Sequence, residues 1–304
     1  MRMLRTAAMA ALMVLAGACS PAPGPDRRPA RMPVAPSGGW VYQLQGYPGG
    51  QLDELAHVPQ SIAVIDLARD AHGDYFRPDE IAALQATGKL VLAYVQIGSI
   101  EEFRPEYAGL RAEHPDVILN KWSGSPNEYF VAYWEPRWWE LVLRPRLDQV
   151  LRAGFDGVYL GTPLAYDEAE LLLAHGRDRE DLGGAMVDLI IRMSEYAKAG
   201  NPDMRIVPQN SPELSHYPDY TAAIDGIGVE GLFVRATNEP CIQDHCTQNL
   251  AEARALRDAG KLVLAVDYAE SDELIASTCA RYRAERFTGY IGVRELDTAR
   301  ASCG

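Results

Sequence analysis

The sequence lacks the short motifs that mark several common enzyme classes. It contains no G-x-S-x-G segment for a serine nucleophile and no H-E-x-x-H segment for zinc. No glycine-rich phosphate loop follows the first predicted strand, so we expect no nucleotide cofactor. Basic charge is also scarce: the formal net charge is −13, which argues against a nucleic-acid partner and would attract a cationic ligand. An acidic surface that only keeps the protein soluble explains this charge equally well.

Cysteine is sparse as well, with five residues in the chain. Four of them lie near the C-terminus, and an even set in an oxidising compartment predicts two disulfides. Because Cys241 and Cys246 bracket a short loop, we pair them with each other, which leaves Cys279 to join the tail at Cys303. The alternative is a metal site of Cys241, His245 and Cys246, but the spacing offers no second ligand pair. We therefore expect neither a metal nor a cofactor.

The N-terminus has the pattern of a targeting segment. Arg2 and Arg5 precede an apolar run over residues 7–15 that is too short to span a bilayer, and small residues lead to Cys19. This pattern resembles a bacterial lipobox and predicts a signal peptide over residues 1–18, a lipid on Cys19 and a Pro-rich tether over 19–38. Ser20 directly after the cysteine favours the outer membrane, facing the periplasm or the exterior. An ordinary cleaved signal is the alternative.

The remaining residues, 39–304, predict one α/β domain and a monomer. Apolar runs of strand length alternate with amphipathic helical patterns, and such runs are typical of a parallel sheet covered by helices. We predict a (β/α)8 TIM barrel, with a doubly wound open sheet as the competitor. The predicted strands span residues 40–45, 62–67, 90–97, 157–160, 205–208, 226–229, 262–266 and 289–293. The predicted helices span residues 78–86, 137–153, 183–199, 249–259 and 271–286.

One predicted strand is the most informative. Residues 157–160 end where a barrel of this kind usually carries a catalytic side chain, but the next residue is Gly161, which has none. Asp156, at the start of this strand, should face the opposite end of the barrel and cap a turn. An irregular insertion over residues 109–134 should lie at the end where the strands finish, where loops build binding sites.

Together, the strand-end segments resemble the glycoside hydrolase family of endo-α-1,4-polygalactosaminidases and its bacterial and archaeal TIM-barrel relatives. The resemblance runs from about residue 40 to residue 297. It rests on the order and spacing of residues 42–45, 64–66, 93–94, 97–98, 101–104, 133–136, 154–160, 208–210, 225–230, 261–268 and 289–293.

The resemblance implies two catalytic carboxyl groups, of which this sequence keeps one. Glu230 matches the family's glutamate after the sixth strand, and we expect it to be the acid or base. The family's two aspartates after the fourth strand are replaced here by Gly161 and Leu164, whereas the tyrosine of the same segment survives as Tyr166. The family's glutamate after the third strand is Ser99 here. Asp167 is a candidate for a relocated second carboxyl group.

Sugar rings pack against aromatic faces and their hydroxyls bind to amides and acids, so we searched the predicted strand ends for such groups. The expected substrate-binding residues are Tyr42, Gln43, Asp66, Tyr94, Glu101, Trp134, Tyr159, Tyr166, Gln209, Asn210 and Asp267. We assign Trp138 and Trp139 to packing. Two hypotheses follow from the resemblance: a divergent hydrolase of an amino-sugar polysaccharide, and a barrel that binds such a polysaccharide without cleaving it. A lipoprotein with a purely structural role in the envelope is a third alternative. Since glycosidases need both carboxyl groups, Gly161 and Leu164 predict little or no hydrolysis.

Overall fold

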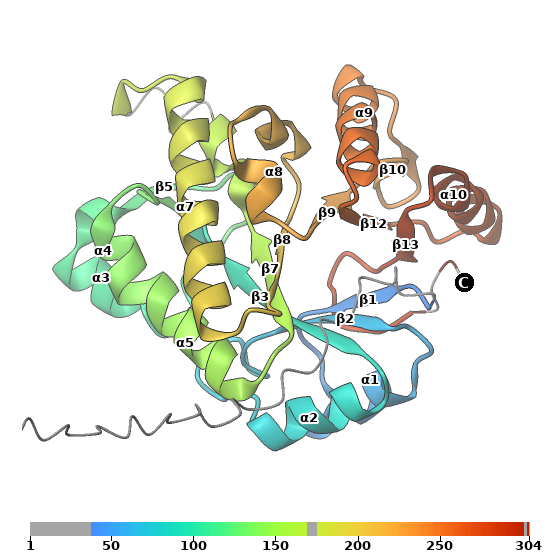
Figure 1. Cartoon of the computed structure of the whole chain (residues 1–304), viewed down its shortest axis with the longest axis horizontal. Coiled ribbons are helices and arrows are strands. Elements are labelled where there is room, and N and C mark those ends of the chain that lie inside the picture. Colours follow the sequence, from blue (N-terminus) through green and yellow to red (C-terminus); the bar gives the residue numbers. More distant parts are fainter. Residues whose placement is uncertain (1–37, 169–174, 301–302, 304) are drawn as a thin grey trace, which may run out of the picture. The chain divides into compact units, whose positions relative to one another are not determined.

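The computed structural model describes residues 38–168, 175–300 and 303. The expected signal peptide, Cys19 and all of the tether except its last residue lie outside the described residues. Eight parallel strands run through the described part and confirm the predicted (β/α)8 barrel (Figure 1). They are β1 (Trp40–Gln43), β2 (Ile62–Asp66), β3 (Leu90–Gln96), β7 (Gly157–Gly161), β8 (Arg205–Pro208), β9 (Gly226–Glu230), β12 (Leu262–Asp267) and β13 (Thr288–Ile291).

The strands pair in two runs that meet at β8 and β9. One run has the order β1-β2-β3-β7-β8 and the other has the order β13-β12-β9. A parallel bridge between Gln209 and Gly228 joins them. At the opposite edge, the Trp40 ring on β1 lies 5.7 Å from the Tyr290 ring on β13. Consecutive strands are therefore neighbours all the way around the barrel.

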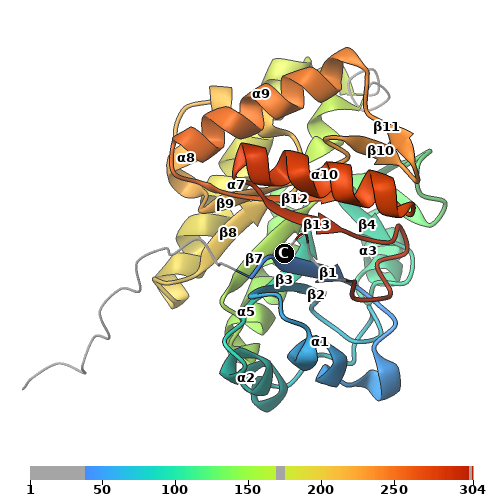
Figure 2. The same cartoon turned by 90° about the vertical axis from the view of Figure 1, so that its right-hand side faces the viewer.

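Helices follow the strands and cover the outside of the barrel. The helix predicted over 78–86 has these bounds, and four further predicted helices are present with small shifts at their ends. Helices α9 and α10 lie beside β9, β12 and β13 in both views (Figures 1 and 2). The helices are α1 (Asp53–His57), α2 (Pro78–Ala86), α3 (Tyr107–Glu113), α4 (Pro136–Trp138), α5 (Arg144–Ala153), α7 (Arg179–Gly200), α8 (Tyr220–Ala223), α9 (Asp244–Asp258) and α10 (Asp272–Glu285). A π turn over Trp139–Leu143 joins α4 to α5. No helix among the described residues is both long and apolar enough to cross a membrane.

Aromatic rings fill the interior of the barrel. The rings of Trp40 and Tyr42 stack with a centroid distance of 5.5 Å, and the Tyr159 ring lies 5.3 Å from Tyr42 and 6.4 Å from Tyr94. These side chains come from β1, β3 and β7, so they can meet only inside the barrel. Because side chains alternate between the two faces of a strand, they also show which residues of each strand point inward.

Two aspartates fix neighbouring strands at the end where the strands begin. Asp156 Oδ2 accepts from the backbone N–H of Val91, 2.8 Å away, and Asp225 Oδ2 accepts from Ile206 N–H, 3.0 Å away. Asp156 therefore lies at the end predicted for it, on a turn before β7. Both residues stand directly before a strand glycine, so the same local sequence, Asp-Gly, makes the same contact twice.

The insertion after β3 is regular, whereas the sequence indicated irregular structure. Its strands β4 (Ser99–Glu101), β5 (Ile118–Lys121) and β6 (Glu128–Val131) form an antiparallel sheet in the order β4-β6-β5. Since β4 begins three residues after β3 ends, this sheet lies at the carboxyl end of β3. The other antiparallel pair, β10 (Val234–Ala236) with β11 (Glu239–Pro240), follows β9.

Both predicted disulfides are confirmed. Cys241 is bonded to Cys246, and Cys279 on α10 is bonded to Cys303 in the tail. Trp138 and Trp139 are buried, and the Trp138 indole N–H donates to the carbonyl oxygen of Ile97 over 2.9 Å. Their packing role is also as predicted.

Candidate functional site

A row of inward-facing positions surrounds the mouth of the barrel, where the strands end. Asp66 pairs with Tyr94, Gln96 pairs with Gly161, and Glu230 pairs with Val266, which in turn pairs with Tyr290. Tyr94 and Tyr290 belong to the interior aromatic cluster, so their partners in register also face inward. The ends of β2, β3, β7 and β9 therefore contribute Asp66, Gln96, Gly161 and Glu230 to one rim.

Glu230 is held in place by two neighbours. The Tyr268 hydroxyl donates to Oε1, and the Asn210 amide donates to Oε2 over 3.2 Å. Asn210 also accepts from the backbone N–H of Glu230, 2.9 Å away. Burial, followed by the charge of Glu230, raises the pKa of Tyr268 well above its ordinary value, so the phenol remains a donor. Both carboxyl oxygens of Glu230 thus act as hydrogen-bond acceptors.

Three consecutive barrel strands, β7, β8 and β9, are followed by residues with unusual backbone conformations. Thr162, directly after β7, has φ of 64°, and Asn210, after β8, has φ of 60°. Gly231, after Glu230, has φ of 67°. A β-branched residue such as Thr162 rarely adopts a left-handed conformation, and such strain is often found at functional sites.

The place of the missing side chain at Gly161 is filled by Tyr94. A Cβ atom added to Gly161 would lie 2.4 Å from the Tyr94 hydroxyl oxygen and 2.5 Å from Cζ of the same ring. Burial, together with the charges of Glu101, Glu128 and Glu230, raises the pKa of Tyr94 well above its ordinary value. The tyrosine hydroxyl is therefore a neutral group at the point where the family resemblance expects a carboxylate.

Two of the expected substrate-binding acids are bound to one arginine. Arg104 Nη1 and Nη2 donate to the two oxygens of Asp66 at 3.0 and 2.8 Å, and Arg104 Nε donates to Glu101 at 3.0 Å. Burial opposes the charge on the guanidinium, but the two acids raise the pKa of Arg104 well above its ordinary value. Asp66, Tyr94, Gln96 and Arg104 line one small cavity, of about 10 Å³. Its walls thus carry paired charges at the rim of the barrel.

Glu128, on β6, is a site residue that the sequence analysis missed. Its Oε1 accepts from the Gln96 amide over 2.7 Å and from the Ser99 hydroxyl over 2.5 Å. Ser99 Oγ also lies 2.9 Å from Thr162 Oγ1. Burial raises the pKa of Glu128 to about 7. The insertion thus places a carboxyl group at the ends of β3 and β7. The predicted strand ends did not indicate this residue. The one sequence feature that could have indicated it is an acid that alternates with Phe130 in a short apolar segment.

Two expected site residues, Asp267 and Gln43, point away from the barrel interior. Asp267 accepts from the Tyr282 hydroxyl on α10 and from the backbone N–H of Phe233 and Val234. Burial raises its pKa to about 6, although these donors lower it. Gln43 donates to the carbonyl oxygen of Asp297. Both predictions of a place at the rim are wrong, because each residue is one position out of register with the inward-facing row.

Of four other expected substrate-binding residues, three are buried and one is partly exposed. Tyr42 and Tyr159 are buried in the barrel at 1% and 0% exposure, so neither offers a ring face to a sugar. Tyr166 is also buried, and its hydroxyl donates to Glu213. Trp134 is partly exposed and lies 5.2 Å from the ring of His175. Of the four, only Trp134 offers part of its ring to solvent.

Asp167, the predicted relocated carboxyl group, lies on a loop after β7. It forms an ion pair with Arg179, and its side chain is 52% exposed. A solvated, paired carboxylate has little of the low-dielectric environment that raises the pKa of a catalytic acid. Glu128 fits that role better.

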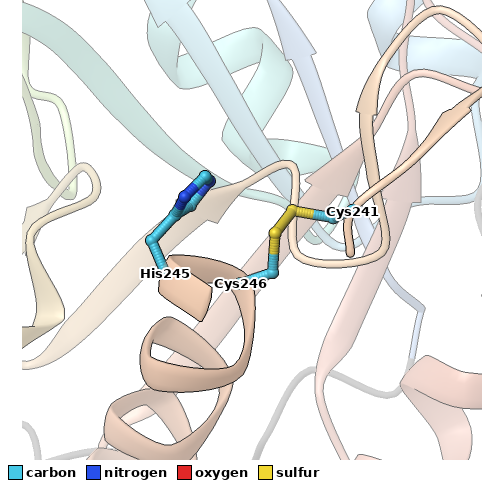
Figure 3. Close-up of side chains that lie close together, drawn as sticks. All are labelled: Cys241, His245 and Cys246. Atoms are coloured by element: carbon cyan, nitrogen blue, oxygen red, sulfur yellow. A yellow bond between two sulfur atoms is a disulfide. The ribbon is translucent and has the colours of Figure 1, made fainter. Parts of the chain in front are cut away.

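The Cys241, His245 and Cys246 cluster lies at the start of α9 (Figure 3). Their potential ligand atoms lie within 4.8 Å of one another. Figure 3 shows the two sulfur atoms bonded to each other, so neither is a thiolate, the form that binds metal ions.

The sequence matches glycoside-hydrolase family GH114 over residues 24–304. The chain belongs to this family. GH114 membership thus confirms the predicted resemblance over most of the chain. An uncharacterized protein of Deinococcus radiodurans is 32% identical over 90% of this chain and 85% of its own length. An uncharacterized protein of Thermotoga maritima is also 32% identical, over 77% of this chain and 72% of its own length.

Solved structures share the GH114 barrel fold. Aspergillus fumigatus Ega3, solved in complex with galactosamine, superimposes with a TM-score of 0.67 at 18% identity, covering 88% of this chain and 96% of Ega3. The glycoside hydrolase domain of PelA from Pseudomonas aeruginosa gives the same TM-score and identity, and the match covers 88% of this chain and 99% of the PelA domain.

Proposed function

We propose that the protein cleaves an amino-sugar polysaccharide across the mouth of its barrel. The observation that carries the proposal is the placement of Glu230, an inward-facing carboxylate at the end of β9 whose two oxygens accept from Tyr268 and Asn210. Membership of GH114 supports glycosidic bond cleavage as the reaction. The galactosamine in the Ega3 structure and the acidic balance of this chain, net −13, support a cationic sugar.

The fixed carboxylate suits attack on an anomeric carbon. In retaining glycosidases one carboxylate bonds to the sugar while a second carboxyl group protonates the leaving oxygen. The resemblance implied an acid or base role for Glu230, but we propose the first role for it instead, because two donors hold its carboxyl group in one orientation. Gln209, directly after β8, pairs with Gly228 on β9 and offers an amide to sugar hydroxyls, whereas the Asn210 amide is already bound to Glu230.

The test is a reducing-end assay on partly deacetylated polygalactosamine. We expect wild-type turnover, and a loss of at least 100-fold in Glu230→Gln, since the amide can neither carry the negative charge nor form the sugar ester. Glu273→Gln, which removes an exposed acid from α10, is the matched control and should behave like wild type. Turnover in Glu230→Gln equal to wild type would refute the assignment of Glu230.

A second function, binding without cleavage, is favoured by one observation. Gly161 lacks the carboxylate that the family pattern expects, and Tyr94 fills its place. Calorimetry with galactosamine oligosaccharides separates the two functions: binding by a wild-type protein that releases no reducing ends would support the second.

A further inference from the structure

The insertion sheet brings a second acid to the rim. Glu128 on β6 stands directly opposite Glu101 on β4, and β4 follows the end of β3. Glu101 is tied to Arg104, whereas Glu128 faces Gln96 and Ser99. Of two adjacent acids, one is thus paired with a cation and the other has only neutral donors at its carboxyl group.

Three oxygens connect Glu128 to the end of β7. Ser99 Oγ lies 2.5 Å from Glu128 Oε1 and 2.9 Å from Thr162 Oγ1. A serine hydroxyl has one hydrogen and two lone pairs, so Ser99 can donate to one of these neighbours while it accepts from the other. Thr162 directly follows Gly161 and has a left-handed backbone, and its hydroxyl lies next to that of Ser99. The series Glu128, Ser99 and Thr162 therefore forms a path for a proton toward the strand end that has no side chain.

The surroundings of Glu128 keep its carboxyl group near the point of half-protonation at neutral pH. Burial raises its pKa to about 7, the charge of Glu101 raises it further, and hydrogen bonds from Ser99 and Ser125 and the charge of Arg104 lower it. Tyr94, from β3, is the other ionisable group that senses Glu128, and burial and nearby acids keep it neutral. An acid that titrates near neutral pH is suited to proton transfer in both directions.

We propose that Glu128 is the second carboxyl group of this site and supplies its proton through Ser99 and Thr162. The proposal rests on the proposed hydrolysis at Glu230. It replaces the carboxylate missing from β7 by one delivered from β6, and it assigns the Ser99 hydroxyl a task that an alanine could not perform. Glu128 is 5% exposed, so it acts through the two hydroxyls and is a positioning and proton-holding residue.

The proton and electron balance closes over two steps. In the first, Glu230 bonds to the anomeric carbon, and the bond between that carbon and the glycosidic oxygen breaks. The glycosidic oxygen takes the hydroxyl proton of Thr162. Ser99 then gives its proton to Thr162, and Glu128 gives its proton to Ser99. In the second, water bonds to the anomeric carbon and releases Glu230. The proton of that water returns through Thr162 and Ser99 to Glu128, so both carboxyl groups regain their initial states.

The experiment compares pH profiles of cleavage in four proteins. Wild type should lose turnover above pH about 7 as Glu128 ionises. Glu128→Gln and Ser99→Ala should each lose at least 100-fold in kcat, the size of a general acid's contribution, and Ser99→Thr, which keeps the hydroxyl, should retain the wild-type profile. The double variant Glu128→Gln/Ser99→Ala should be no slower than Glu128→Gln, because both changes interrupt one path. Glu113→Gln, on the exposed side of α3, is the charge-matched control.

The outcomes separate this proposal from the proposed function. Loss of cleavage in Glu230→Gln with an unchanged rate and profile in Glu128→Gln would overturn the role of Glu128 and leave hydrolysis standing. No cleavage by wild type, with galactosamine oligosaccharides still bound, would overturn both. If Glu128→Gln fails to fold, Ser99→Ala decides the question by itself: wild-type turnover in that variant overturns the proton path.

Discussion

At the scale of single residues, the Tyr94 ring can occupy its position only because residue 161 is a glycine. The Tyr94 ring lies where a side chain at 161 would begin, and it packs against the Tyr42 and Tyr159 rings at centroid distances of 6.3 and 6.4 Å. A packed ring cannot move aside without disturbing its neighbours. Restoring the family's aspartate is therefore a change to the core as well as to the site.

We predict that Gly161→Asp lowers the free energy of unfolding by about 1–3 kcal/mol, the usual cost of overpacking. Denaturant unfolding measures this change. Adding Tyr94→Val should recover part of the loss, because it removes the overlapping ring. Gly73→Asp controls for charge and loss of glycine, because a Cβ added to Gly73 would have no heavy atom within 4 Å. Equal stability of Gly161→Asp and wild type would contradict the packing argument.

The residue scale also shows where sequence reasoning succeeds and fails. Glu230 was found because it follows a predicted strand and matches the family's glutamate at that position. Asp267 was misplaced, because an error of one residue in the expected strand end reverses the face on which a side chain lies. Glu128 was missed, because it lies in the insertion and not at the end of a predicted barrel strand. Its place in the site follows only from its contacts with Gln96 and Ser99 in the structure.

At the scale of elements, the eight barrel strands and the longer helices were predictable. Their apolar period is sustained over enough residues to outweigh local exceptions. The short pieces were not: helix α1 has one buried residue, Leu55, and the strands β4, β5 and β6 are three or four residues each. Such elements owe their structure to the surfaces they pack on, which the local sequence does not encode.

The two disulfides should differ in their contribution to stability. They close sequence separations of 24 and 5 residues, and the chain-entropy argument assigns about 3 kcal/mol to the longer loop and about 2 kcal/mol to the shorter one. We predict that Cys279→Ser/Cys303→Ser lowers the unfolding free energy more than Cys241→Ser/Cys246→Ser does. Alkylation of the unreduced wild-type protein followed by mass spectrometry should label none of these four cysteines. The reverse order of stabilities would contradict the loop-length argument.

At the scale of the whole molecule, the proposed location depends on the N-terminal segment. We propose that Cys19 carries a lipid and that the barrel is attached to the outer membrane through the residues that follow. The prediction is that Cys19→Ser moves the protein from the membrane fraction to the soluble fraction, measured by fractionation and by labelling with a fatty-acid analogue. Ser20→Ala, which keeps the cysteine, should stay with the membrane. Retention of the Cys19→Ser protein in the membrane fraction would refute lipid attachment.

The two Asp-Gly contacts at the end of the barrel where the strands begin have a consequence for how such proteins diverge. Asp156 and Asp225 tie adjacent strands together at the end remote from the rim, so register does not depend on the residues that face a substrate. Replacement of a residue at the rim should therefore leave the pairing of the strands intact at their other end. Selection can change the chemistry at one end of this barrel without first having to rebuild the other.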